Sequence, residues 1–188
     1  MSLDEMAETL FFILENYSGG MLLIEDMTKY VSDSMPSDLI GSICTQRHVE
    51  CDIVIHFQTI GKIAHPKIWG NMNWLRFHKC EDTVNRHESK FGGEVTHLKI
   101  LQCLVDEKYW GGDQRFFAYL DKDLGKIKGN FTVQDFQKAI DNCLSKDSRI
   151  IKEELSRLDL DSGKKMYSDP KVVIDSIRKQ YYDQYFGN

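Results

Sequence analysis

The stretch Gly20-Met-Leu-Leu-Ile-Glu-Asp-Met-Thr-Lys-Tyr30 decides the fold that we expect for this chain. Four apolar residues, Met21 to Ile24, run directly into two acids, Glu25 and Asp26. An apolar run without polar alternation is typical of a strand buried on both faces, as in a parallel sheet under helices. Acids at the carboxyl end of such a strand lie where open α/β sheets bind their ligands. The structural alternative is a buried strand that ends in two solvated acids.

A second apolar strand follows at about residues 52–57, and it ends at the polar residue Gln58. An Arg47-His48 pair precedes this strand, and Ser37-Asp38 is a suitable cap for a helix before the pair. The order of strand with acids, helix, Arg-His and strand with Gln resembles the additive-strand P-loop ATPases of the HerA/FtsK type. That group includes DNA-pumping, conjugation and phage-packaging ATPases and the Zot-like phage assembly ATPases. The resemblance covers roughly residues 8–80.

The resemblance implies roles for five residues. Glu25 and Asp26 stand where the family has its Walker B acids, which bind Mg²⁺ and polarise the attacking water. Gln58 would orient that water or sense the γ-phosphate of ATP. Arg47, and more weakly Arg76, would reach nucleotide across a subunit interface. The structural alternatives are an exposed arginine at a helix end and a glutamine bonded to a loop carbonyl.

The chain departs from the family pattern in two ways. The family has Asp before Glu, whereas here Glu25 precedes Asp26, so which acid does which task is open. No G-x-x-x-x-G-K-[ST] occurs, so the backbone cradle and the lysine that hold ATP phosphates are missing. Residues 1–24 are too few for the strand, loop and helix that would carry them. We therefore expect either a fragment, which the vector-like Met1-Ser2-Leu3 favours, or a degenerate relative; only the complete protein would bind ATP and Mg²⁺.

For the fold, we predict an α/β chain with a three-layer P-loop NTPase-like core, incomplete at its N-terminus, and a helical C-terminal extension. The core would have a mainly parallel sheet, and its domain would span residues 1–129, with the extension at 130–188. The expected strands and hairpin are at residues 21–25, 52–57, 74–79 and 114–128. The expected helices are at residues 4–16, 38–46, 82–90, 94–109, 133–144, 148–158 and 170–185, with a short one beginning at His65-Pro66.

The composition narrows the class of protein. The chain has 188 residues, of which 41% are hydrophobic and 11% aromatic, as in an ordinary globular protein. Its net charge of -5 argues against a simple electrostatic nucleic-acid binder, although a ring motor can keep a local basic pore. Five irregularly spaced cysteines do not indicate a disulfide framework. With no visible signal peptide and no apolar run near the ~20 residues that span a bilayer, we expect a cytoplasmic protein.

Two functions remain open from the sequence. The first is part of an ATP-driven DNA-translocating or packaging motor of a phage or mobile element, hexameric by resemblance. The second is a non-catalytic interaction module with a degenerate ATPase fold, which would bind a partner through its C-terminal helices; the missing phosphate loop favours it. A weaker third is a small-molecule hydrolase built on the two acids, for which no nucleophile–base pair is present. Aromatic residues beside Arg115 are suited to stacking on bases, but packing against the sheet is their more frequent role.

Overall fold

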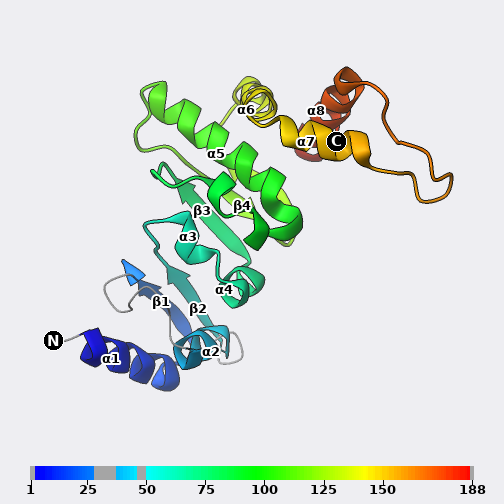
Figure 1. The fold of residues 1–188 in the computed structure, drawn as a ribbon. Helices are drawn as coiled ribbons and strands as arrows, with labels where there is room; N and C mark the ends of the chain where they lie inside the picture. Colours follow the sequence, from blue (N-terminus) through cyan, green and yellow to red (C-terminus); the bar gives the residue numbers. More distant parts are fainter. Residues whose placement is uncertain (1–2, 28–36, 46–49, 187–188) are drawn as a thin grey trace. The chain divides into compact units, whose positions relative to one another are not determined.

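The structure, a computed structural model, describes residues 3–27, 37–45 and 50–186 (Figure 1). The chain divides into two compact units. The first contains residues 1–72 and 80–91, and the second contains residues 73–79 and 92–188. The domains that we predict at residues 1–129 and 130–188 are based on the family resemblance, whereas the two units are defined by the packing of the chain. The predicted domains stay a prediction.

The first unit is built on a parallel pair of strands, β1 (Gly20–Ile24) and β2 (Cys51–Ile55). Between them the chain forms α2 (Ser37–Thr45), and before them α1 (Leu3–Asn16). The parallel pairing that the sequence predicts for these two strands is therefore observed. Because parallel strands need a crossover, the intervening helix is the connection expected of this unit.

One face of this pair forms the core of the first unit. Side chains from both helices and from the strand pack there, with half-buried Leu22, Ile53 and Ile55 beside them. The other face is open, because Met21, Leu23 and Val54 are 64%, 57% and 46% exposed. The predicted burial of this strand on both faces is therefore wrong: successive strand residues point to opposite faces, and α1 and α2 cover only one. The fully packed residues of the core are Leu10, Leu14, Ile24, Met27 and Leu39.

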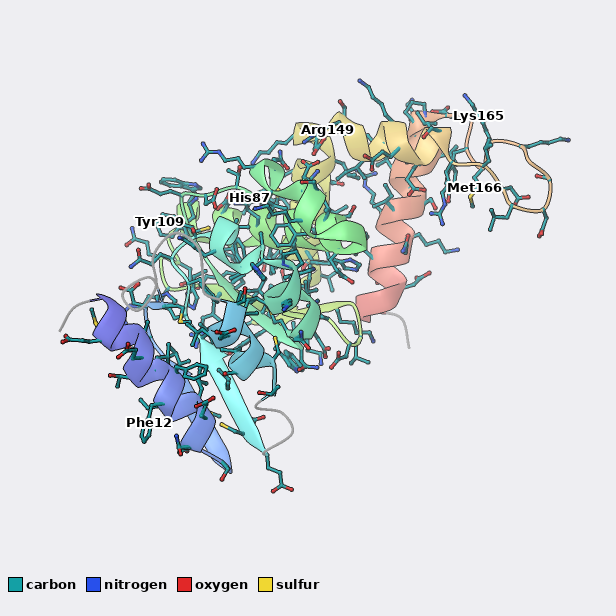
Figure 2. The ribbon with its side chains drawn as sticks, turned by 60° about the horizontal axis from the view of Figure 1, so that its bottom comes forward. Phe12, His87, Tyr109, Arg149, Lys165 and Met166 are labelled. Carbon is teal, nitrogen blue, oxygen red and sulfur yellow. The ribbon has the colours of Figure 1, made fainter. Side chains whose placement is uncertain are left out.

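Two short helices and a loop complete the first unit. They are α3 (Ile60–Ile63), α4 (Pro66–Asn71) and a segment with the 3₁₀ turns η3 (Val84–Arg86) and η4 (Glu88–Lys90). The rings of Trp69 and Phe91 meet edge to face at 4.8 Å and close this part of the unit. The predicted polar helix at 82–90 is wrong, because this segment forms two separate 3₁₀ turns, and the side chain of Asp82 at its start is bonded to the backbone of α3. On α1, Phe12 points away from the unit and is 66% exposed (Figure 2).

The second unit contains a three-stranded antiparallel sheet in the order β3-β4-β5. Its strands are β3 (Trp74–His78), β4 (Phe117–Asp121) and β5 (Lys126–Gly129). The predicted hairpin near 114–128 is confirmed as β4–β5. The expectation that residues 74–79 join a parallel sheet is wrong, since β3 pairs antiparallel with β4. Its alternating pattern predicts a strand but does not specify the partner.

Four helices belong to the second unit, and α5 is the one that packs across all three strands of the sheet. The helices are α5 (Val95–Trp110), α6 (Val133–Lys146), α7 (Ser148–Ser156) and α8 (Pro170–Phe186), with the 3₁₀ turn η5 (Gly92–Glu94) before them. α5 packs on the strands and α6 packs on α5 (Figure 1). Thr132 and Asp135 form the capping box expected at the start of α6, with the Thr132 N–H donating to Asp135 at 2.8 Å.

Taken together, the described residues form a mixed α/β structure with one two-stranded and one three-stranded sheet. A P-loop core with a mainly parallel sheet is not present in these residues. Within the same described ranges, none of the helices has the length and apolar character needed to cross a membrane.

Candidate functional site

The parallel pairing of β1 and β2 aligns the carboxyl ends of the two strands, which the acids follow directly and Gln58 follows after three residues. Ile24 pairs with Ile55, so both strands end at the same level. Beyond them, the backbone N–H of His56 donates to the carbonyl of Ile24 at 2.9 Å, and the N–H of Met27 donates to the carbonyl of His56 at 3.0 Å. The residues after β1 are therefore bonded to the residues after β2. The carboxyl ends of parallel strands are where α/β sheets bind ligands.

The backbone at the two acids is held by its buried neighbours. Ile24 and Met27 are 4% and 0% exposed and lie on either side of the acids. Asp26 has a φ of 51°, in the left-handed region that aspartate tolerates better than most residues. Glu25 is exposed and Asp26 is half-buried. The turn thus holds the backbone of both acids directly after the end of β1.

Two adjacent carboxylates are a donor set that suits Mg²⁺. Among the described residues, no group of three or more His, Cys, Asp or Glu side chains is arranged to hold a metal ion. Mg²⁺ does not need such a group, because it is usually bound by one or two carboxylates, water and substrate phosphates. Glu25 and Asp26 therefore fit a magnesium ion that arrives with a nucleotide better than a closed protein metal site.

The structure does not place either arginine candidate relative to the two acids. Arg47 lies outside the described residues, so its prediction is not tested. Arg76 is exposed on β3 and belongs to the second unit. Its guanidinium carbon lies 3.8 Å from the centre of the Phe117 ring, so the side chain is engaged with an aromatic ring of its own sheet.

A third group of residues supports the segment after Gln58, and the sequence did not predict it. α3 begins at Ile60, and Asp82 accepts a hydrogen bond at 3.0 Å from the backbone N–H of Gly61 in its first turn. The same carboxylate lies 2.9 Å from Nε2 of His87 and accepts the N–H of Thr83 at 2.9 Å. Burial favours a higher pKa for Asp82, but the hydrogen bonds from Gly61, Thr83 and His87 outweigh it, and the net pKa is lowered.

The ring of His87 packs directly on Gly61. A Cβ atom at position 61 would lie 2.9 Å from Cε1 of this ring, closer than real side chains approach. Asp82 and His87 therefore fix the helix that begins two residues after Gln58. The sequence carries only a weak signal for this contact, because the partners are 21 residues apart and α3 is too short to show a periodic pattern.

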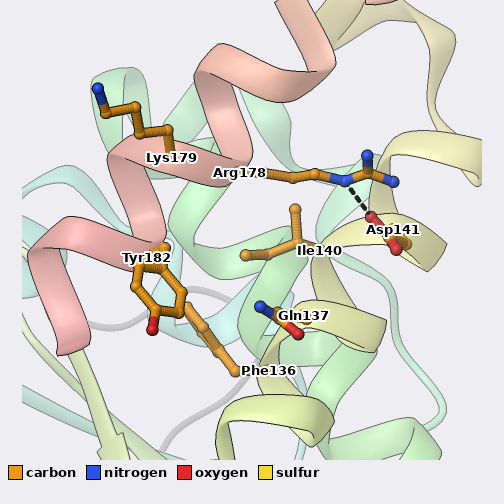
Figure 3. A pocket seen from close by; sticks show the side chains of 7 residues that line it. All are labelled: Phe136, Gln137, Ile140, Asp141, Arg178, Lys179 and Tyr182. Atoms are coloured by element: carbon orange, nitrogen blue, oxygen red, sulfur yellow. Dashed lines mark hydrogen bonds and ion pairs between the residues drawn. The ribbon is translucent and has the colours of Figure 1, made fainter.

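A groove lies between α6 and α8 in the second unit (Figure 3). Its volume is about 500 Å³. The Nε of Arg178 donates to Asp141 across it at 2.7 Å, and the same guanidinium lies 3.3 Å from Asp175. The hydrogen bond to Asp141 raises the pKa of Arg178 further. The side chains that line the groove are Phe136, Gln137, Ile140, Asp141, Arg178, Lys179 and Tyr182.

Comparison with known proteins adds no relative. No protein-family model matches the chain, and no curated protein or solved structure is similar to it. The resemblance to HerA/FtsK-type ATPases therefore rests on the order of motifs in this sequence alone.

Proposed function

We propose that this chain carries the Walker B and sensor elements of an ATP-driven DNA-translocating or packaging motor of a phage or mobile element. The observation that supports it best is the shared sheet edge. Glu25-Asp26 and Gln58 follow two hydrogen-bonded parallel strands, as the acids and the sensor glutamine do in motors of this type. In the complete protein, a three-layer P-loop core would hold the nucleotide against this edge.

The chemistry of these side chains suits the proposed roles. Bound Mg²⁺–ATP would supply the phosphoryl group and its charge neutralisation. An ionised carboxylate at position 25 or 26 accepts hydrogen bonds from water and orients it for attack. The amide of Gln58 can donate to a phosphate oxygen and accept from the same water. Arg47 or Arg76 would reach the nucleotide of a neighbouring subunit in a hexameric ring, as the resemblance implies.

The free lateral edge and the exposed face of the β1–β2 pair support the proposal that this pair is part of a larger core. Among the described residues, β1 pairs with β2 on one side and with no strand on the other. The outward face at Met21, Leu23 and Val54 is apolar and exposed. A strand that belongs to the missing part would pair with the free lateral edge of β1. A further layer would cover the exposed face, and these elements would carry the missing phosphate loop. Exposed apolar patches of this kind usually mark such contacts.

ATP hydrolysis by the native gene product tests this proposal. We expect Glu25→Gln or Asp26→Asn to lower the turnover rate by at least about 10²-fold, the size of a general-base effect. Gln58→Ala should also lower it. Glu15→Gln, which changes an exposed acid on α1, is the matched control and should leave the rate unchanged. Undiminished turnover in both the Glu25 and Asp26 variants would rule out the Walker B assignment.

The groove between α6 and α8 favours a second candidate, a non-catalytic interaction module. Tyr182 of the groove lining and Val172, also on α8, are 42% and 52% exposed, which is suitable for contact with a protein partner. This alternative predicts that the native product neither binds Mg²⁺–ATP nor hydrolyses it. Binding of Mg²⁺–ATP in a calorimetric titration would exclude the alternative.

A further inference from the structure

The outer face of the β3–β4–β5 sheet collects aromatic and basic side chains. The inner face, which packs on α5, consists of Leu75, Phe77, Ala118, Leu120 and Ile127, of which all but Leu75 are buried. Since side chains alternate along a strand, the intervening residues share the outer face. The antiparallel register aligns Arg76 with Tyr119 and Lys128 in one row across the three strands. The full outer face consists of Trp74, Arg76, His78, Phe117, Tyr119, Asp121, Lys126 and Lys128.

The rings on this face form a continuous set. Trp74 meets Tyr119 edge to face at 6.2 Å, and Tyr119 meets Phe117 at 5.5 Å. His78 lies 5.3 Å from Phe117. Trp74 is 49% exposed, which is unusual for a residue whose burial would stabilise the fold. Rings held in place by their neighbours on a strand scaffold offer a preformed surface for stacking.

Cations accompany the rings. The Nζ of Lys128 lies 4.6 Å from the centre of the Trp74 ring, and Arg76 lies over Phe117. Asp121 is the one acid of the outer face; it is buried and paired with Lys128 at 2.8 Å. The balance on the face is therefore positive, with three lysine or arginine side chains against one acid, although the whole chain has a net charge of -5. Such a local reversal of sign attracts a polyanion.

We propose that this outer sheet face binds single-stranded DNA. Aromatic rings stack on bases, and stacking requires bases that are not already stacked in a duplex. Lys126, Lys128 and Arg76 would contact the phosphates that flank the stacked bases. The choice of DNA as the ligand rests on the proposed function, a motor that moves DNA. The inference adds that the DNA is single-stranded and names the surface that contacts it.

Fluorescence anisotropy with a labelled oligothymidylate of about twelve nucleotides tests this inference, since single-strand sites span about 4–16 nucleotides. The assay uses the 188-residue chain and no ATP. We expect Trp74→Ala to weaken binding by about tenfold, the effect of losing one stacked base. Trp74→Phe keeps a ring and should retain most of the affinity. The matched control is Trp110→Ala, which removes a 76% exposed tryptophan at the end of α5, away from the sheet.

Salt dependence tests the cations separately. Each lysine bound to a single-strand phosphate contributes about 0.7 to the slope of log affinity against log salt concentration. We expect Lys126→Gln and Lys128→Gln each to reduce the slope by about this amount. Lys138→Gln, on the exposed side of α6, is the matched control and should leave the slope unchanged.

Three outcomes would overturn the inference. One is equal affinity for an abasic strand of the same length, because charge alone would then explain binding; this arm needs no variant and holds even if Trp74→Ala does not fold. The others are tighter binding to duplex DNA and tighter binding to RNA of the same sequence. The failure of this inference can be distinguished from the failure of the proposed function. If single strands do not bind but ATP hydrolysis depends on Glu25 and Asp26, only this inference is overturned. If single strands bind but ATP turnover does not depend on either acid, only the proposed motor function is overturned.

Discussion

At the scale of single residues, the second unit contains a buried ion pair between Lys99 and Asp147. The Nζ of Lys99 lies 2.5 Å from Asp147, and both side chains are 6% exposed. Asp147 also caps α7 by accepting the N–H of Arg149 at 3.0 Å, and it accepts from the Arg149 guanidinium at 2.9 Å. Removing one partner of such a contact leaves the other buried without its counter-charge. Removing one partner of this cluster should therefore cost more stability than removing one partner of an ion pair at the surface.

We expect Lys99→Met or Asp147→Asn to lower the free energy of unfolding by about 3–5 kcal/mol, measured by urea denaturation. Asp141→Asn is the control, because its pair with Arg178 is nearly half exposed on both sides. Its effect should stay within about 1 kcal/mol. Equal losses for Asp147→Asn and Asp141→Asn would contradict the view that burial makes the difference.

The same carboxylate predicts a pH dependence. The hydrogen bond from Arg149 lowers the pKa of Asp147, burial opposes this, and Lys99 lowers the pKa further, so that its net pKa lies well below the ordinary value. A carboxyl whose pKa is depressed on folding stabilises the protein above its unfolded pKa of about 3.9, and this contribution is lost as the pH falls toward the folded pKa. Asp147→Asn should therefore reduce the loss of stability between about pH 5 and pH 3. Parallel stability profiles of the variant and the unmodified chain would contradict this.

At the scale of elements, the segment after Gln58 depends on a contact with the loop at 80–91. Asp82 caps α3, and the ring of His87 occupies the space beside Gly61. Any larger side chain at position 61 must displace the ring, and with it the contact to Asp82. The orientation of the proposed sensor segment thus depends on a glycine outside the sheet edge.

We expect Gly61→Ala to destabilise the protein by about 1–3 kcal/mol, the usual cost of overpacking. Gly70→Ala is the matched control: it also lies in a short helix, and a Cβ there meets nothing within 4 Å. It should be neutral or stabilise by up to about 1 kcal/mol. In a double-mutant cycle monitored by thermal unfolding, His87→Ala should reduce the cost of Gly61→Ala. Additive effects would show that the ring is not the obstacle.

Local patterns in the sequence predicted elements better than partners. The alternation at 74–78 and the glycines around 125 predicted β3 and the β4–β5 hairpin, because period and turn chemistry are local. The antiparallel pairing of β3 with a strand forty residues later, from Phe117, has no local signal. Likewise, the apolar run at 21–24 predicted a strand but not that one face would stay open. Burial depends on what the other elements cover.

The candidate site shows the same limit. Glu25, Asp26 and Gln58 could be selected from the order of motifs, and the parallel register aligns the ends of the two strands that precede them. The contact between Asp82 and Gly61 could not be predicted from the sequence, because its partners lie on a loop and a four-residue helix. The sequence indicated only part of the aromatic outer face of the second sheet, because the register decides which residues of β3, β4 and β5 lie beside one another.

At the scale of the whole molecule, the two units carry different parts of the proposed activity. The first unit holds the acids and Gln58, the proposed sensor, and the second holds the outer sheet face. We therefore expect Glu25→Gln to lose turnover while its anisotropy titration with oligothymidylate matches that of the unmodified chain. A parallel loss of DNA binding in this variant would show that the acids support the fold rather than the chemistry.

The most direct measurement is the rate of ATP hydrolysis by the native gene product as the concentration of single-stranded DNA increases. We predict a saturable stimulation whose midpoint agrees with the dissociation constant from anisotropy. We also expect a flat curve at background level for Glu25→Gln and an unchanged curve for Glu15→Gln. A Glu25→Gln curve that coincides with the unmodified one would contradict the assignment of the acids, and an unstimulated rate in the unmodified product would contradict a DNA-driven motor.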